Sequence, residues 1–398
     1  MNTDVSSSAT RSSGWRRPAS MLAIGSFAVG TDAFVIAGIL PSMADSLAVS
    51  VGVAGQLVSA FALAYGLSAP LVGALTATWG RRTALLAALA VFVVGNAATA
   101  FAPTYWAVLA ARVLSAVGAA LYTATATSTA ATIAGDERRG RAISIVMLGM
   151  TSSLVLGAPL GTVLGGALGW RATLWLVAGL GVLAVAAVVL GVPAVPGSVS
   201  AGVARRLRPL AQPAILGVLA RTVVAFVGIY LPYTYLSVVY QEATGEVPAK
   251  LSLLLLVFGL SATAGNLVAG MLVDRFGPHR VVIAACLSMT VLFALLPLVG
   301  GSFGLALVAV VLSGWLSFSV TTPQQHEIIA RALPEDRAFV TSLYQSAAYL
   351  AISLSAVVGA VGISAVGHAV VGPLAAALVL VAALLTLWTV RARHESYS

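Results

Sequence analysis

The sequence predicts an all-α membrane protein with twelve transmembrane helices in two pseudo-symmetric halves of six. Three observations lead to this fold class. The composition is 60% hydrophobic and only 8% charged, whereas soluble domains carry about 25% charged residues. Twelve apolar segments follow one another along the 398 residues. Two separate motifs each occur twice, and the copies of each motif lie at nearly the same distance apart in the chain.

Each apolar segment is long enough to cross the roughly 30 Å hydrocarbon core of a bilayer as a helix. Helices are required because backbone groups in lipid must find their hydrogen-bond partners within the segment. The predicted spans are residues 20–40, 54–76, 83–101, 104–133, 141–168, 170–193, 212–241, 251–273, 280–299, 302–330, 337–365 and 367–390.

The distribution of basic residues predicts the orientation. If the N-terminus is cytoplasmic, the outer side holds only Arg171 and Lys250. The inner side then holds seventeen arginines, at positions 11, 16, 17, 81, 82, 138, 139, 141, 205, 206, 208, 275, 280, 331, 337, 391 and 393. Because cytoplasmic loops carry an excess of basic residues, we expect both termini in the cytoplasm and an even number of spans.

The repeats predict the domain organisation. The segment 73–82 is matched by 270–280, an offset of 270 − 73 = 197, and 136–144 is matched by 334–342, an offset of 334 − 136 = 198. Two halves in the same orientation are typical of transporters, with a substrate site between them near the midplane. We expect two six-helix halves, at 20–193 and 212–390, joined by a flexible cytoplasmic linker at 194–211. An N-terminal tail at 1–19 and a C-terminal tail at 391–398 complete the chain.

The first repeated motif resembles the signature that follows the second and eighth spans of the major facilitator superfamily. The C-terminal copy keeps the family's acid as Asp274, whereas Ala77 stands at that position in the N-terminal copy. In the family this acid belongs to a cytoplasmic charge network that steadies one conformation. The resemblance therefore implies a conformational role, carried more by the C-terminal copy, for Gly73, Gly80, Arg81, Asp274 and Arg275.

Asp32 lies in the middle of the first span, where an ionisable group is costly and is by default a functional-site hypothesis. It follows Ser20 by twelve residues, which places it about 18 Å from the inner face. Arg112 follows Thr104 by eight residues, which places it about 12 Å from the outer face, the same depth in a core of about 30 Å. We expect Asp32 and Arg112 to face each other across the N-terminal half.

Two resemblances assign chemistry to this pair. The segment 112–120 resembles a pattern in the family's fourth span whose arginine is implicated in proton coupling. The segment 30–41 resembles a stretch of bacterial chloramphenicol-resistance and sugar-efflux proteins, but the acid stands one position earlier and Ala33 occupies the usual position of Glu. Asp32 and Arg112 are therefore candidates for proton coupling, and Asp32 also for substrate binding. A structural ion pair is the alternative. Because one position turns a helix residue by about 100°, either the helix is rotated or the acid faces a different neighbour than in those proteins.

The fifth span carries glycines four residues apart, a spacing that lets helix backbones approach closely. Pro159 lies among them and favours a kink because it lacks a backbone donor. The stretch resembles the motif of the twelve-span drug:proton antiporter group. We expect the two halves to seal against each other along this stripe, with conformational roles for Gly157, Pro159, Gly161 and Gly165; plain helix packing is the alternative.

Other polar and aromatic side chains within spans are candidates for substrate binding. Tyr230 and Tyr233 end the seventh span and either line a cavity for an aromatic substrate or belong to the outer aromatic belt. Glu327 and His326 lie near the inner end of the tenth span, where we expect interfacial groups; a proton role is the alternative. The remaining candidates are Tyr122, Arg221, Asn266, Trp315 and Gln345.

Several function classes find no support in the sequence. The arginines are too dispersed for a nucleic-acid surface, and the four histidines and single cysteine offer no metal site. A P-loop needs Gly-Lys, but Lys250, the only lysine, follows Ala249. We therefore expect no enzyme, no catalytic residues, no metal and no cofactor, so that any pumping uses an ion gradient, which the family resemblance implies is the proton gradient.

The family resemblance implies a proton-coupled secondary transporter in the cell's inner membrane, exporting a small, fairly apolar drug or antibiotic by alternating access. Its expected partners are that substrate, protons and lipid, and we expect it to function as a monomer. A sugar or metabolite exporter or uniporter of the same fold is the main alternative. A transporter-like receptor or a membrane enzyme is less favoured, because the tail 391–398 is short and the polar groups are scattered.

Overall fold

The computed structural model describes residues 14–76, 78–197, 212–299, 301–332 and 337–395, and every regular element in these ranges is a helix. Eleven helices within them are long and apolar enough to cross a membrane, and α13 (Pro278–Ala294) is a shorter apolar helix. The predicted twelve-helix membrane fold is confirmed. Ala77, most of the proposed linker and most of the N-terminal tail lie outside the described residues, so the domain boundaries stay predictions.

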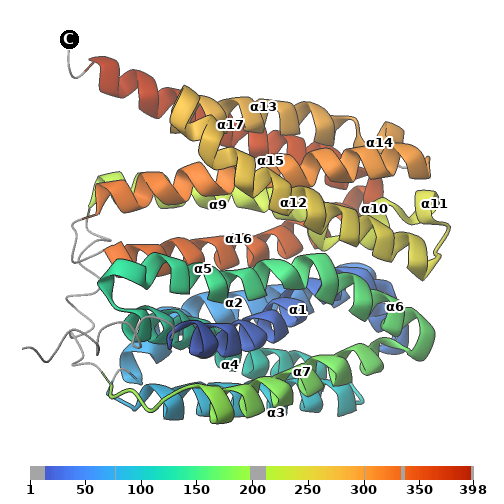
Figure 1. Cartoon of the computed structure of the whole chain (residues 1–398). Coiled ribbons are helices and arrows are strands. Elements are labelled where there is room, and N and C mark those ends of the chain that lie inside the picture. Colours follow the sequence, from blue (N-terminus) through green and yellow to red (C-terminus); the bar gives the residue numbers. More distant parts are fainter. Residues whose placement is uncertain (1–13, 77, 198–211, 300, 333–336, 396–398) are drawn as a thin grey trace, which may run out of the picture.

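The helices form two groups that lie side by side (Figure 1). The N-terminal group comprises α1 (Arg16–Ser46), α2 (Val51–Leu75), α3 (Arg81–Phe101), α4 (Tyr105–Ala134), α5 (Arg139–Ser152), α6 (Ala158–Leu168) and α7 (Trp170–Gly191). The C-terminal group comprises α9 (Pro213–Thr234), α10 (Leu236–Val239), α11 (Gln241–Thr244), α12 (Pro248–Phe276), α13, α14 (Leu296–Val299), α15 (Phe303–Arg331), α16 (Arg337–Val366) and α17 (Val371–Glu395).

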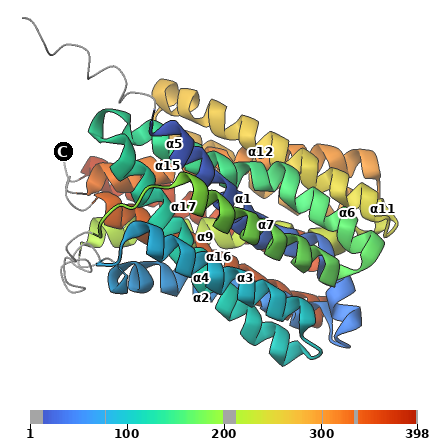
Figure 2. The same ribbon diagram turned by 60° about the horizontal axis from the view of Figure 1, so that its bottom comes forward.

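The two ends of the bundle differ in charge. At one end α1, α3 and α5 begin with Arg16, Arg81 and Arg139, and α15 ends with Arg331; we call this the basic end. The connections at the other end, which we call the opposite end, turn at positions such as Gly169. Figure 2 shows the long helices running between these two ends. The arginine distribution thus maps onto one end of the bundle.

The two copies of the first repeated motif close their turns differently. Gly277 has φ +79° between α12 and α13, a left-handed conformation that favours glycine. Gly80 has φ −55° before α3, and the following Arg81 amide donates to the Val195 carbonyl at 2.8 Å. The glycine of the C-terminal copy is therefore required by its backbone angle, whereas the N-terminal copy is held by the segment after α7.

The glycine stripe of the fifth span packs against α1. A Cβ atom on Gly157 would overlap the Thr31 side chain, one on Gly161 would overlap Val35, and one on Gly165 would lie 2.6 Å from the Ile39 Cγ2 atom. Both helices thus contribute residues at steps of four, which is close packing through small residues. The expectation that this stripe seals the two halves against each other is wrong, because α1 belongs to the same half.

Another face of the fifth span does contact the C-terminal half. The span is interrupted by a π-helical turn at Ser153–Gly157, just before Pro159, whose missing N–H removes one α-helical hydrogen bond. The Ser252 hydroxyl donates to the Pro159 carbonyl at 2.9 Å. A Cβ atom on Gly259 would lie 2.6 Å from the Leu154 carbonyl oxygen. The irregular turn and the proline therefore form the contact with α12.

Candidate functional site

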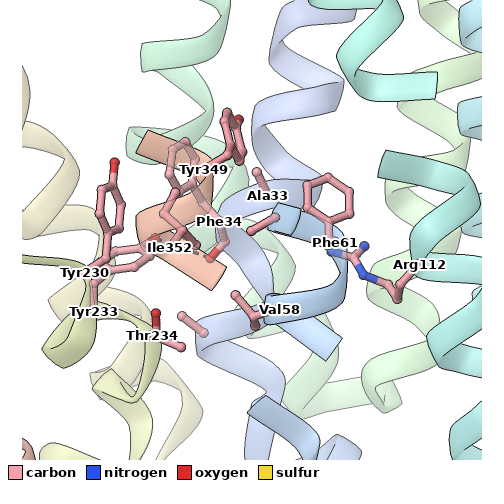
Figure 3. Close-up of a pocket in the computed structure, with 12 residues that line it drawn as sticks. Ala33, Phe34, Val58, Phe61, Arg112, Tyr230, Tyr233, Thr234, Tyr349 and Ile352 are labelled. Carbon is pink, nitrogen blue, oxygen red and sulfur yellow. Dashed lines mark hydrogen bonds between the residues drawn. The ribbon is translucent and has the colours of Figure 1, made fainter. Parts of the chain in front are cut away.

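A cavity lies between the two halves, walled by α1, α2 and α4 on one side and by α9 and α16 on the other (Figure 3). The space between atoms within it, part of which is open to the surroundings, is about 470 Å³, and in this conformation the room left there for water-sized molecules is only about 30 Å³. Most of the wall is apolar or aromatic, as is usual for small-molecule sites. The lining residues are Ala33, Phe34, Ala37, Val58, Phe61, Ala62, Arg112, Tyr230, Tyr233, Thr234, Tyr349 and Ile352.

Asp32 and Arg112 form an ion pair in the N-terminal half. The Arg112 Nη1 donates to Asp32 Oδ1, and the two side chains are 1% and 0% exposed. Asn96, on α3, donates a second hydrogen bond to Asp32 Oδ2 at 3.3 Å. The equal depth inferred from helical rise thus corresponds to direct contact, and the carboxylate is bound on both oxygens.

Asp32 is directed away from the cavity. Its partners lie on α3 and α4, whereas the next residues of α1, Ala33 and Phe34, line the cavity. At Ala33 the cavity wall is a methyl group. One position earlier, Asp32 points into the interior of the N-terminal half. Asp32 can therefore affect the cavity through Arg112, but it is not placed to contact a substrate there.

Arg112 connects the ion pair to the cavity. Its guanidinium carbon lies 4.3 Å from the centroid of the Phe61 ring, a cation–π contact, and both residues line the cavity (Figure 3). Its Nε atom is buried and has no hydrogen-bond partner among the described residues. One side chain therefore contacts Asp32 and also forms part of the cavity wall.

The two halves contact each other around the cavity. The Tyr65 and Tyr349 rings stack across α2 and α16 with centroids 3.7 Å apart. The Tyr233 hydroxyl donates to the Phe34 carbonyl at 3.3 Å. Ser59 and Ser353 share a hydrogen bond of 2.8 Å. These two hydrogen bonds lie between the middle of the helices and the opposite end.

Of the residues predicted for substrate binding, only Tyr230 and Tyr233 line this cavity. Tyr122 is fully buried and donates to the Leu22 carbonyl at 2.7 Å, which joins α4 to α1 inside one half. Asn266 is exposed and accepts a hydrogen bond from Thr322 at 2.8 Å. Arg221 lies in a charge cluster described below. Trp315 and Gln345 have half-buried side chains that do not line the cavity.

The predicted conformational residues of the repeated motif lie at the basic end. Arg81 donates from Nη1 to the Ser128 hydroxyl on α4 at 3.3 Å. Asp274 is exposed, and Arg275 lies with its guanidinium carbon 5.3 Å from the Phe276 ring centroid. Gly73 lies within α2, at a position where the structure describes the backbone alone. The structure thus ties the N-terminal copy to α4, whereas Asp274 is exposed to solvent.

A second cluster of charges lies in the C-terminal half near the basic end. Glu327 Oε1 accepts hydrogen bonds from Arg221 Nη2 at 3.0 Å and from Arg331 Nη2, and His279 Nδ1 lies 3.9 Å from Oε2. Arg221 also donates to the Thr389 hydroxyl at 3.1 Å. The cluster therefore links α9, α13, α15 and α17. Among the described residues, no group of three acidic, histidine or cysteine side chains is placed to hold a metal ion.

Sequence reasoning missed the residues that make the cavity apolar and the second partner of the acid. Phe34, Phe61 and Ile352 are hydrophobic residues in hydrophobic spans, so their type alone gives no signal. Asn96 carried a weak signal, since a buried amide in a span needs a partner.

Comparisons with known proteins agree with this architecture. The profile of the Major Facilitator Superfamily matches residues 22–247 and 220–397. The chain is 34% identical to the chloramphenicol resistance protein of Streptomyces lividans, over 92% of this chain and 94% of that protein. It is 30% identical to the inner membrane transport protein YdhP of Escherichia coli (strain K12), over 95% and 97% of the two chains.

The fold is also shared with solved structures. The crystal structure of a D-xylose-proton symporter matches with a TM-score of 0.76 over 94% of this chain and 97% of that chain, at 17% sequence identity. A likeness at this identity concerns the fold alone. Together, the sequence matches and the shared twelve-helix architecture identify a multi-pass membrane protein, and the chain belongs to the major facilitator superfamily of secondary transporters.

Proposed function

We propose that this protein is a proton-coupled secondary transporter that exports a small, fairly apolar compound by alternating access. The observation that carries the proposal is Arg112, which pairs with a buried carboxylate and also lines the cavity between the halves. A proton on Asp32 removes the charge that holds Arg112, and so changes the cavity wall and the balance between conformations. The proton gradient is then the energy source, with no cofactor and no catalytic chemistry.

The orientation follows from the arginines. We place the protein in the inner membrane of the cell with its basic end in the cytoplasm, so that the opposite end faces outward. The contacts Ser59–Ser353 and Ser252–Pro159 then close the outer side in this conformation. Alternating access requires these contacts to break while the basic ends approach each other. Because one chain supplies both cavity walls, the proposed functional unit is a monomer.

The cavity wall supports an apolar substrate better than a sugar. A sugar-binding site needs a dense set of polar groups, whereas aromatic rings and aliphatic side chains such as Val58 and Ile352 dominate here. The relative from Streptomyces lividans is a chloramphenicol resistance protein, which makes chloramphenicol the first compound to test.

The test is uptake of radiolabelled chloramphenicol into proteoliposomes with an acidic lumen. We expect the wild-type protein to accumulate the compound when the pH gradient is present and to lose this accumulation when a protonophore dissipates it. Asp32→Asn should no longer respond to the gradient. Asp45→Asn is the matched control, because it makes the same chemical change in α1 at an exposed position. Gradient-driven uptake by Asp32→Asn at the wild-type level would show that Asp32 is not the coupling acid.

A further inference from the structure

We propose that the cavity selects neutral aromatic compounds that carry a hydrogen-bond acceptor, such as a nitro or carbonyl oxygen, and rejects cations. Arg112 is the residue that binds the acceptor. This inference rests on the proposed transport function and specifies its substrate class. It follows from the charge of the cavity wall, the spare donors of Arg112 and the aromatic rings around it.

The first argument is the sign of the charge. Arg112 is the only charged side chain among the residues that line the cavity. Asp32 lies behind it and is turned toward Asn96. When Asp32 is ionised the pair has no net charge, and when Asp32 is protonated the site carries one positive charge. In neither state does the wall offer a negative charge, so a cation would lose its hydration without gaining a counter-charge.

The second argument concerns hydrogen-bond donors. A guanidinium has five N–H groups in a fixed planar arrangement. Nη1 donates to Asp32, and no other hydrogen bond joins an Arg112 side-chain donor to the described residues. Nε has almost no accessible surface, so the donors that a ligand at this wall can reach belong to Nη1 and Nη2. The ion pair also holds the guanidinium in place against Phe61, so these donors are oriented before a ligand arrives. A neutral acceptor on the ligand can then accept a hydrogen bond from them.

An anion is less suited to this state than a neutral acceptor. The positive charge of Arg112 is already compensated by Asp32, so a buried anion would add an unpaired charge. Protonation of Asp32 removes that compensation. The preference for neutral compounds over anions therefore depends on Asp32, whereas the rejection of cations does not.

The third argument is the aromatic wall. Phe34 and Tyr233 make an edge-to-face contact with centroids 6.1 Å apart, and the stacked Tyr349 ring lines the cavity with them. Figure 3 shows these rings and Phe61 on several sides of the same space. Aromatic side chains prefer offset-stacked or edge-to-face partners. A ligand with an aromatic ring can meet them in these geometries while its acceptor lies at Arg112.

Binding to the purified full-length protein in detergent tests the proposal without a proton gradient. The probes are chloramphenicol and three compounds on one nitrophenyl ring: 4-nitrobenzyl alcohol, 4-nitrobenzoate and (4-nitrobenzyl)trimethylammonium. Competition against labelled chloramphenicol gives their relative affinities at neutral pH. We expect the neutral compound to bind at least about tenfold more tightly than the cation, a difference of about 1.4 kcal/mol, with the anion between them. A cation that binds as tightly as the alcohol would overturn the proposal.

Three variants locate the effect. Asp32→Asn removes the compensating charge, so 4-nitrobenzoate should gain affinity while the cation gains none. Val58→Asp adds a carboxylate to the cavity wall and should raise the affinity of the cation about tenfold, whereas Val58→Asn, of nearly the same size, should not. An unchanged cation affinity in folded Val58→Asp would place the ligand outside this cavity and overturn the assignment.

The outcomes separate this proposal from the transport proposal. Charge selection in detergent together with no response to a pH gradient in proteoliposomes would support the cavity's ligand class and contradict proton coupling. Gradient-driven transport of chloramphenicol together with equal binding of the cation and the alcohol would support proton coupling and contradict the proposed ligand class.

Discussion

The two halves of the protein each bury a carboxylate, but in different settings. Asp32, in the N-terminal half, is fully buried, and Arg112, its only charged partner among the described residues, lines the central cavity. Glu327, in the C-terminal half, is 9% exposed and contacts Arg221, Arg331 and His279 near the basic end. It lies four residues before the end of α15, or about 6 Å along the helix axis.

The number of charged partners determines what a proton on each carboxylate can change. A carboxylate with one charged partner changes that partner's environment completely when it takes a proton. A carboxylate held by two arginines retains favourable interactions with one when the other is lost, and its cluster joins four helices. The C-terminal cluster therefore stabilises the fold of its half, and the N-terminal pair is the one placed to couple protonation to the cavity.

The largest expected effect is on coupling. Glu327→Gln should keep the pH-gradient-driven accumulation of chloramphenicol, although with lower stability, whereas Asp32→Asn should abolish it. The reason is that Arg112 contacts the cavity and the residues around Glu327 do not. Uptake in proteoliposomes, normalised to the amount of folded protein, compares the two variants. Loss of coupling in Glu327→Gln alone would reverse the assignment of roles.

The next effect is on stability and tests the number of partners. Arg112→Ala leaves Asp32 buried without a counter-charge and should lower the free energy of unfolding by about 3–5 kcal/mol. The double variant Asp32→Asn/Arg112→Ala should recover part of this loss. Arg221→Ala should cost less, about 1–3 kcal/mol, because Arg331 still pairs with Glu327. Unfolding in detergent measures all three, and equal losses for the two single arginine variants would contradict the comparison.

A smaller effect tests how the helix that carries Asp32 is held. Gly161→Ala adds a Cβ that overlaps Val35 on α1 and should lower the free energy of unfolding by about 1–3 kcal/mol. Gly179→Ala, in α7, meets nothing within 4 Å and should be neutral or stabilising by up to about 1 kcal/mol. If both substitutions have the same effect, the glycine stripe does not position α1.

The smallest effect concerns the contact between the halves. Ser252→Ala removes the hydrogen bond to the Pro159 carbonyl, worth about 0.5–1.5 kcal/mol. It should shift the balance toward the conformation in which the basic ends are closer. Spin labels at Ser144→Cys and Asp274→Cys, both exposed at the basic end, would report the distance in a Cys286→Ser background. Ser261→Ala is the control, because the Ser261 hydroxyl bonds within α12; an equal shift there would contradict the assignment.

Much of this fold was predictable because membrane helices leave strong signals. Apolar length gave the twelve spans, and the arginines predicted the charge difference between the two ends of the bundle. Boundaries were less accurate where polar residues continue a helix, as at Arg16, or where aromatic residues hide a break, as after Thr234. The glycine spacing of the fifth span correctly indicated close packing, but spacing names no partner, and the partner proved to be α1.

The sequence by itself determined the fold class, the single carboxylate in mid-membrane and its equal depth with Arg112, because helical rise converts residue number into depth. Only the tertiary structure decided the direction of Asp32. The rotation of α1 is set by its packing against α4, α5, α7 and the glycine stripe, and these contacts turn Asp32 toward Asn96 and Arg112 and leave Ala33 at the cavity. A pattern along one chain fixes depth, whereas the face that a residue presents depends on neighbours distant in the sequence.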